Sequence, residues 1–159
     1  MTAGIMVCHC FNNMVTEIEQ EVFSNIKTLL GSFKGPVIGT MNQRKDISEL
    51  IPSGKNYQEN FMDSHHHGII LQWINQYKID TVYLVGCHYN LCIRKIFNEI
   101  EECVKHLPQD QYTKFSVHIV KECTAAVSDL DNNCVLNMAD YEKTVEQVYD
   151  LIALTDVNG

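Results

Sequence analysis

The sequence has few positive charges. It contains 12 Lys and Arg against 20 Asp and Glu, which gives a formal net charge of −8, and no basic run is longer than two residues. A protein that binds nucleic acid generally needs clustered Lys and Arg side chains to neutralise phosphates. The composition therefore excludes a general nucleic-acid-binding function.

Long hydrophobic runs are also missing. No apolar stretch approaches the ~20 residues that a membrane-spanning helix needs, and the first residues, M-T-A-G-I-M-V, lack the basic start of a signal peptide. We therefore expect no membrane partner and a cytoplasmic location.

The seven cysteines form no C-x-x-C motif, so a thioredoxin-type redox site is unsupported. Their number is odd and most of them fall inside apolar runs, which favours reduced, buried thiols over a secreted disulfide framework. They are Cys8, Cys10, Cys87, Cys92, Cys103, Cys123 and Cys134.

What the sequence does contain is an alternation of strands and helices. With 159 residues, 45% of them apolar, the chain predicts one domain over residues 1–159. The predicted strands are continuous apolar runs, which is typical of parallel sheets buried on both faces. The fold class is therefore α/β: a three-layer, mostly parallel, doubly wound, Rossmann-like sheet. The strands are Gly4–Phe11, Pro36–Met41, Thr81–Gly86 and Phe115–Lys121.

Caps and spacing predict four helices. The first runs from Thr16 to Gly31, the second begins near Asp63–Ser64 with Trp73 and Tyr77 in the core or an interface, the third runs from Asn90 to about His106, and the last is capped by Asp140. The polar stretch Asn42–Asn60 reads as a long functional loop, and Cys134–Met138 is either a short strand or a helical turn.

The segment V-Y-L-V-G-C-H-Y-N-L-C-I (Val82–Ile93) places Cys92 where a strand gives way to a helix. Ligand sites in such sheets lie beyond the carboxyl ends of the strands. A helix N-terminus offers unpaired N–H groups and a positive dipole end, which favour a thiolate and stabilise an oxyanion. The local sequence alone also allows a bland interpretation, in which Cys92 is one more small buried residue.

The same segment resembles the signature of the isochorismatase-like cysteine hydrolases, which include nicotinamidases and carbamoylsarcosine amidase. The resemblance implies that Cys92 is the nucleophile and that Cys87–His88 is a cis peptide beside the oxyanion hole. Two further segments fit in order: K-N-Y-Q-E-N-F resembles the segment that supplies the family's catalytic lysine, here Lys55, and I-V-K-E-C-T-A-A (Ile119–Ala126) resembles its late strand end.

The first strand departs from the family pattern. Its usual aspartate is replaced by His9 in I-M-V-C-H-C-F, and no acidic residue occurs in the first sixteen. A neutral imidazole is a competent base for a thiol, and Lys55 would hold the thiolate by its charge. The family's D-x-H-x-H type of metal site is replaced by T-M-N-Q-R-K. We therefore predict no catalytic metal and no cofactor, and we interpret His65-His66-His67 as a solvated helix start.

The resemblance implies a cytosolic hydrolase that cleaves a small amide or carbamoyl C–N bond through a cysteine thioester. Tyr57, Phe61, His88 and Tyr89 would line the pocket for a small-molecule substrate, and relatives commonly form dimers or tetramers. The missing aspartate leaves an alternative open, a catalytically inactive relative that binds a small ligand or a protein.

Overall fold

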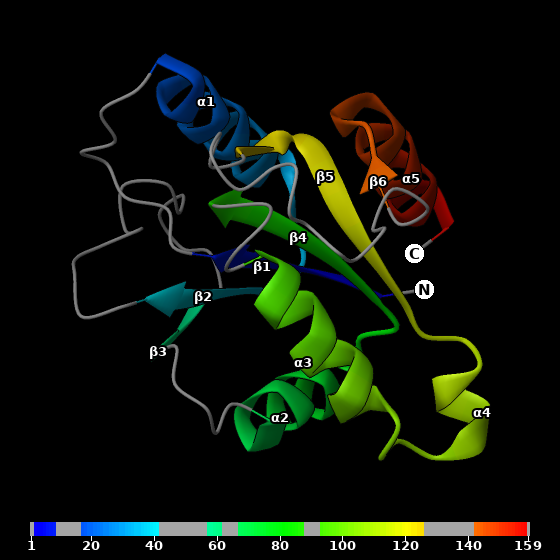
Figure 1. Cartoon of the computed structure of the whole chain (residues 1–159). Helices are drawn as coiled ribbons and strands as arrows, with labels where there is room; N and C mark the ends of the chain where they lie inside the picture. The colour runs from blue at the N-terminus through cyan, green and yellow to red at the C-terminus, as the bar shows by residue number, and fades with distance from the viewer. Residues whose placement is uncertain are drawn as a thin grey trace.

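The computed structural model describes residues 2–8, 17–41, 57–61, 67–87, 93–125 and 142–158. Within these ranges strands and helices mostly alternate, as the apolar pattern predicts (Figure 1). The strands are β1 (Ala3–Cys8), β2 (Val37–Met41), β3 (Tyr57–Phe61), β4 (Thr81–Cys87), β5 (Ser116–Ala125) and β6 (Glu142–Lys143). The helices are α1 (Glu17–Ser32), α2 (His67–Tyr77), α3 (Arg94–Val104), α4 (Gln109–Tyr112) and α5 (Val145–Asn158).

The strands of the described residues form one six-stranded sheet with the order β3-β2-β1-β4-β5-β6. Every neighbouring pair is parallel. From β1 the chain builds outward on one side through β2 and β3, and from β4 it builds outward on the other side through β5 and β6. The predicted doubly wound α/β fold is therefore confirmed.

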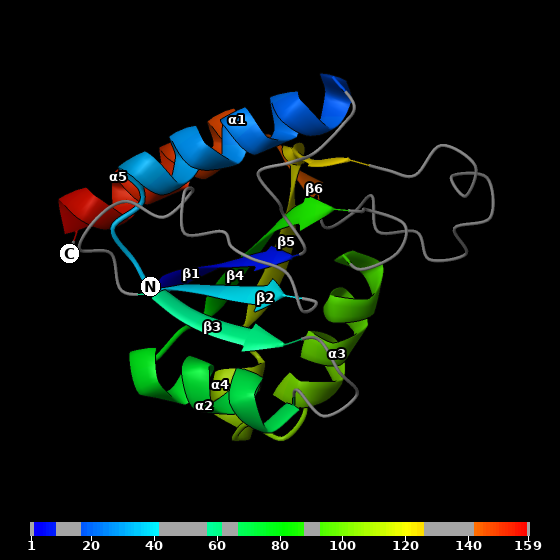
Figure 2. The same ribbon diagram turned by 90° about the vertical axis from the view of Figure 1, so that its left-hand side faces the viewer.

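Helices cover both faces of the sheet, with α1 and α5 on one face and α2 and α3 on the other (Figures 1 and 2). Alternate residues of each central strand point to opposite faces. In β1, Ile5 and Val7 join the core under α1, whereas Met6 and Cys8 join the core under α2 and α3. This two-sided burial is the reason that the central strands are continuous apolar runs.

Trp73 is a fully buried member of the α2 face and the largest of the fully buried side chains there. Its indole lies over Gly4 of β1, where an added Cβ would come within 2.6 Å of the ring. Tyr77 packs against the same cluster while keeping part of its surface exposed. The prediction that these two residues lie in the core or an interface is confirmed for Trp73, and Tyr77 borders the same core.

Four elements differ from the prediction. The strand β3 overlaps the end of the stretch Asn42–Asn60 that we predicted as a loop. Its sequence Y-Q-E-N-F has no apolar run and forms a strand through pairing with β2. Neither the short helix α4 nor the two-residue strand β6 was predicted. The strand β5 extends four residues beyond the predicted end, to Ala125.

The last helix begins at Val145 and is capped by Thr144 rather than by Asp140. The Thr144 hydroxyl accepts a hydrogen bond from the Gln147 N–H at 3.1 Å, and the Gln147 side chain accepts one from the Thr144 N–H at 2.8 Å. This reciprocal pair is a capping box, which satisfies backbone donors that the helix cannot pair internally. The sequence signal T-V-E-Q was present and was missed.

In the part of the chain that the structure describes, no helix combines the length and apolar character of a membrane span.

Candidate active site

The order of the strands marks one place for a ligand site. In this sheet β1 and β4 lie side by side at the centre, and the chain leaves them in opposite directions. Their carboxyl ends coincide, since Cys8 pairs with Gly86 in β4 and with Thr40 in β2. Open α/β sheets bind ligands in the crevice outside the carboxyl ends at such a switch point. The candidate site therefore lies beyond Cys8 and Cys87.

Gly86 is the residue that shapes this end of β4. Its φ is +117°, a backbone conformation that side-chain-bearing residues rarely adopt, and an added Cβ would lie 1.9 Å from the carbonyl oxygen of Cys8. The backbones of β1 and β4 thus leave no room for a side chain at Gly86, where the two strands end. The glycine that the sequence placed at a tight turn is required by this long-range contact.

Helix α3 returns from this edge along the α2 face. Its side toward the sheet is buried through Ile96, Phe97 and Ile100, preceded by the fully buried Ile93. This packing holds the amino end of α3 near the end of β4 (Figure 1). In the sequence, residues 88–92 join the two elements, and Cys92 is the direct neighbour of Ile93.

Strand β5 completes the same edge on the other side of β4. Thr124 pairs with Gly86 and Ala125 with Cys87, after a register shift that follows Leu84. Within the shifted part, a carboxylate oxygen of Glu122 accepts a hydrogen bond from the Val145 N–H at the start of α5. The Glu122 carbonyl accepts another from the Asn25 side chain of α1 at 2.8 Å. Glu122 therefore anchors both helices of one face.

The two predicted pocket residues on β3 lie at opposite ends of the strand. Tyr57 pairs with Val37 at the start of β2, and Phe61 pairs with Met41 at its end. Parallel strands share one direction, so only Phe61 lies at the edge where β1 and β4 finish. Lys55 precedes Tyr57 by two residues in the sequence.

Most of the predicted site falls outside the described residues. This holds for the nucleophile, the base, the lysine and part of the pocket wall: Cys92, His9, Lys55, His88 and Tyr89. For Tyr57, Phe61 and Cys87 the structure gives only their positions in the strands. His65 and His66 also lie outside the described residues. Cys8, the sequence neighbour of His9, is the last residue of the central strand β1. Ile93, the sequence neighbour of Cys92, directly precedes α3.

Among the described residues, three cysteine thiols are fully buried: Cys8, Cys103 and Cys123. Burial raises the pKa of the Cys103 thiol to about 11 and that of Cys123 to about 12. A thiol with such a pKa is protonated at neutral pH and is a poor nucleophile. The prediction of reduced, buried cysteines is confirmed for these three, and Cys103 and Cys123 are unsuited to nucleophilic catalysis.

Comparison with solved structures finds the same fold in several hydrolases. The YcaC gene product of Escherichia coli, an octameric hydrolase of unknown specificity, matches with a TM-score of 0.64 and 15% identity, over 92% of this chain and 77% of that one. YcaC from Pseudomonas aeruginosa, solved with hexane-2,5-diol and covalent acrylamide, matches with a TM-score of 0.65 and 9% identity, over 92% and 78%.

A third match is the nicotinamidase/pyrazinamidase PncA from Bacillus subtilis, with a TM-score of 0.56 and 12% identity over 79% of this chain and 87% of that one. No protein-family model matches the sequence, and no curated protein matches it significantly. At these identities the likeness shows a shared fold.

Proposed function

We propose that this protein is an isochorismatase-like cysteine hydrolase that cleaves the C–N bond of a small amide or carbamoyl compound. The observation that carries the proposal is the arrangement of residues at the switch point. The backbone of Gly86, near the end of β4, lies against the backbone of Cys8, and α3 follows β4 after a short segment. This strand–glycine–helix arrangement matches the motif that ends in Cys92. The shared fold with YcaC and PncA supports it.

In the proposed reaction, His9 accepts the proton of the Cys92 thiol, and the sulfur attacks the substrate carbonyl carbon. Backbone N–H groups of residues 88–92 stabilise the oxyanion. The C–N bond then breaks, the nitrogen leaves with the proton carried by His9, and a thioester remains on Cys92. Water, deprotonated by His9, hydrolyses the thioester and restores the thiol.

Lys55 is assigned to holding the thiolate–imidazolium pair. A positive charge near a thiolate lowers its pKa. Lys55→Met tests this assignment by itself. A large loss of kcat supports the role. An unchanged kcat assigns the charge to another residue.

The decisive experiment measures ammonia release from nicotinamide, pyrazinamide and N-carbamoylsarcosine by the wild type and by Cys92→Ala. The matched control is Cys103→Ala, which removes a thiol from the opposite end of α3. Turnover by the wild type and the control, together with none by Cys92→Ala, supports the proposal. Equal turnover by Cys92→Ala and the wild type contradicts it.

Acrylamide provides a second test. The P. aeruginosa YcaC structure holds covalent acrylamide, and acrylamide adds to thiolates by forming a bond from sulfur to its terminal alkene carbon, while the neighbouring carbon takes a proton. We expect acrylamide to label Cys92 before any other cysteine. Peptide mass mapping after brief exposure identifies the labelled residue, and preferential labelling elsewhere counts against Cys92.

A second candidate function follows from the first strand, because no acidic residue precedes position 17 and the family's usual aspartate is therefore missing. An inactive relative would bind a small ligand or a partner protein with the same fold. Titration of Cys92 with iodoacetamide against pH separates the two functions. An apparent pKa near the ordinary ~8.5 favours the binding protein, and a strongly lowered one favours the hydrolase.

We also infer that the chain is a homo-oligomer in a reducing, cytoplasmic environment. The E. coli YcaC protein is octameric, and buried thiols such as Cys103 and Cys123 suit a compartment where cysteines stay reduced. Light scattering after size-exclusion chromatography tests the assembly. A monomeric mass at micromolar concentration would contradict it.

A further inference from the structure

Strand β5 contains a bulge beside the candidate active site. Leu84 of β4 pairs with Ile119 of β5. The next pair is Gly86 with Thr124, so β4 advances by two residues while β5 advances by five. The additional residues of β5 leave the ladder with β4. Bulges are common next to active sites, because they redirect the chain and set the alignment of the residues that follow.

The bulge is held against the face that α1 and α5 cover. Val120 and Cys123 are both fully buried in the core that contains residues of these two helices. Between them, Lys121 is exposed and Glu122 is half-buried. In a regular strand, residues three positions apart point to opposite faces. Since Val120 and Cys123 enter the same core, the backbone must bend at the two residues between them.

The two backbone carbonyls in this bend are paired with side chains. The Thr124 hydroxyl donates a hydrogen bond to the Lys121 carbonyl at 3.2 Å. The Asn25 side chain of α1 donates one to the Glu122 carbonyl at 2.8 Å. Carbonyls that leave a ladder need such partners, because a buried backbone group without one costs free energy. These two hydrogen bonds therefore stabilise one conformation of the bend.

The Glu122 side chain adds a third connection. Its carboxylate accepts a hydrogen bond from the N–H of Val145, the first residue of α5. A carboxylate at this position is favourable, because the amino end of a helix carries unpaired donors and a partial positive charge. Glu122 is thus bound to α1 through its carbonyl and to α5 through its carboxylate.

The residues that follow the bulge lie beside the end of β4. Thr124 pairs with Gly86, and Ala125 pairs with Cys87, the last residue of β4. In the sequence Cys87 leads directly into residues 88–92, to which the proposed reaction assigns the oxyanion donors and the nucleophile. A displacement of about 1 Å in catalytic groups can cost on the order of a hundredfold in rate. The alignment of β5 with β4 is therefore a condition for the chemistry.

We propose that Glu122 is a positioning residue for the hydrolase site, an inference that rests on the proposed function. Glu122 holds the bulge from the face of α1 and α5, and the bulge aligns Thr124 and Ala125 with the end of β4. The end of β4 in turn positions the backbone that enters the oxyanion hole. Glu122 acts through this backbone, and its carboxylate, bound at α5, takes no part in the bond-breaking steps.

The test measures kcat and KM for ammonia release from nicotinamide, pyrazinamide and N-carbamoylsarcosine. Glu122→Ala should lower kcat by about tenfold and change KM by less than about twofold, because a misaligned oxyanion hole weakens binding of the transition state rather than of the substrate. Glu122→Gln keeps an oxygen that can accept the Val145 N–H, so it should restore most of the lost kcat. Asn25→Ala, which removes the hydrogen bond from α1, should also lower kcat.

Thr144→Ala is the matched control. It removes the acceptor of the Gln147 N–H at the start of α5 and leaves the contacts of the bulge in place. The variant therefore loosens the same helix as Glu122→Ala does, but kcat and KM should stay at the wild-type values. Circular dichroism and urea unfolding establish that each variant is folded before its kinetics are compared.

Hydrogen exchange provides a readout that does not depend on turnover. Exchange in α5 should accelerate in both Glu122→Ala and Thr144→Ala. Exchange in peptides that cover residues 84–87 and 119–125 should accelerate only in Glu122→Ala. Unchanged exchange in these strand peptides overturns the proposal, because the bulge would then keep its alignment without the carboxylate.

The kinetic outcomes separate this proposal from the proposed function. An unchanged kcat in Glu122→Ala, or an equal loss of kcat in Glu122→Ala and Thr144→Ala, rejects the positioning role while the hydrolase function stands. A wild type that releases no ammonia, or a Cys92→Ala variant as active as the wild type, rejects the proposed function, and the positioning role falls with it.

Discussion

Gly86 of β4 lies so close to Cys8 of β1 that a Cβ at position 86 would fall 1.9 Å from the Cys8 carbonyl oxygen. The two residues are register partners at the carboxyl ends of the two central strands. Their contact leaves no room for a side chain at position 86, so the edge of the sheet where the candidate active site lies requires glycine there.

Replacing Gly86 by alanine should destabilise the protein by about 3–5 kcal/mol, because the methyl group meets backbone and the φ of +117° is unfavourable for alanine. Urea unfolding measures the change. The matched control is Gly31→Ala near the end of α1, where an added Cβ meets nothing within 4 Å. That variant should gain up to about 0.5–1 kcal/mol from helix propensity. Similar stabilities for the two variants would contradict the close approach.

Replacing Lys78 by glycine should stabilise the protein by about 1 kcal/mol, since it relieves the left-handed backbone at the end of α2. Lys114→Gln, which removes the charge of an exposed lysine without a backbone effect, should change stability by less than about 0.5 kcal/mol. Thermal and urea unfolding report both. A loss of stability in Lys78→Gly would show that the lysine side chain makes stabilising contacts.

Removing the carboxylate of Glu122 should loosen α5. Glu122→Gln weakens the hydrogen bond to the Val145 N–H and removes a favourable charge at the helix start, so we expect a loss of about 1 kcal/mol. Thr144→Ala removes one half of the capping box and should cost a similar amount. Hydrogen exchange should accelerate in α5 in both variants and stay unchanged in α3. Uniform acceleration across the chain would argue against a local cap.

The buried thiols predict a loss of stability at high pH. The folded pKa values of Cys103 and Cys123, about 11 and about 12, lie above the ordinary 9.0 because of burial. Between about pH 9 and 11 the unfolded chain loses thiol protons that the folded protein keeps. The free energy of unfolding should therefore fall with rising pH, on the order of 1.4 kcal/mol per pH unit for each thiol. Below pH 9 both states are protonated and the slope from these groups vanishes.

Denaturant unfolding from pH 8 to 11 tests this slope. Tyrosines and lysines also titrate in this range, so the informative quantity is the difference between the wild type and a variant. Cys103→Ala should have a flatter dependence than the wild type above pH 9, and Cys103→Ala with Cys123→Ala a flatter one still. Parallel curves for all three proteins would show that these thiols do not resist ionisation.

The sequence by itself determined the central architecture. Apolar runs at β1, β2, β4 and β5 and helical spacing in α1, α2 and α3 were sufficient for a parallel sheet covered on both faces. Such patterns are readable because burial is encoded locally: a strand covered on both faces needs apolar residues at every position. The same reasoning placed Gly86 at a turn and pointed to the segment that ends in Cys92.

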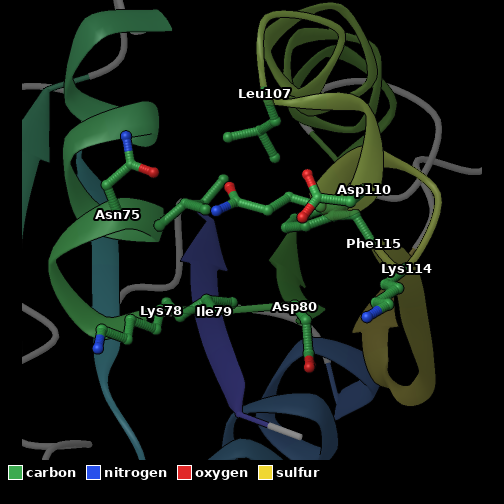
Figure 3. Close-up of a pocket in the computed structure, with 10 residues that line it drawn as sticks. Asn75, Lys78, Ile79, Asp80, Leu107, Asp110, Lys114 and Phe115 are labelled. Carbon is green, nitrogen blue, oxygen red and sulfur yellow. The ribbon is translucent and has the colours of Figure 1, made fainter.

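Only the tertiary structure decided the rest. The polar strand β3 exists because β2 supplies hydrogen-bonding partners, and the role of Glu122 as an anchor for α1 and α5 depends on a register shift in β5. The reason for Gly86 is the backbone of Cys8, 78 positions away in the sequence. The end of α2 and the segment around α4 likewise line one cavity (Figure 3), although no local pattern connects them. Each of these features depends on which distant backbone becomes a neighbour, and that is settled only when the chain folds.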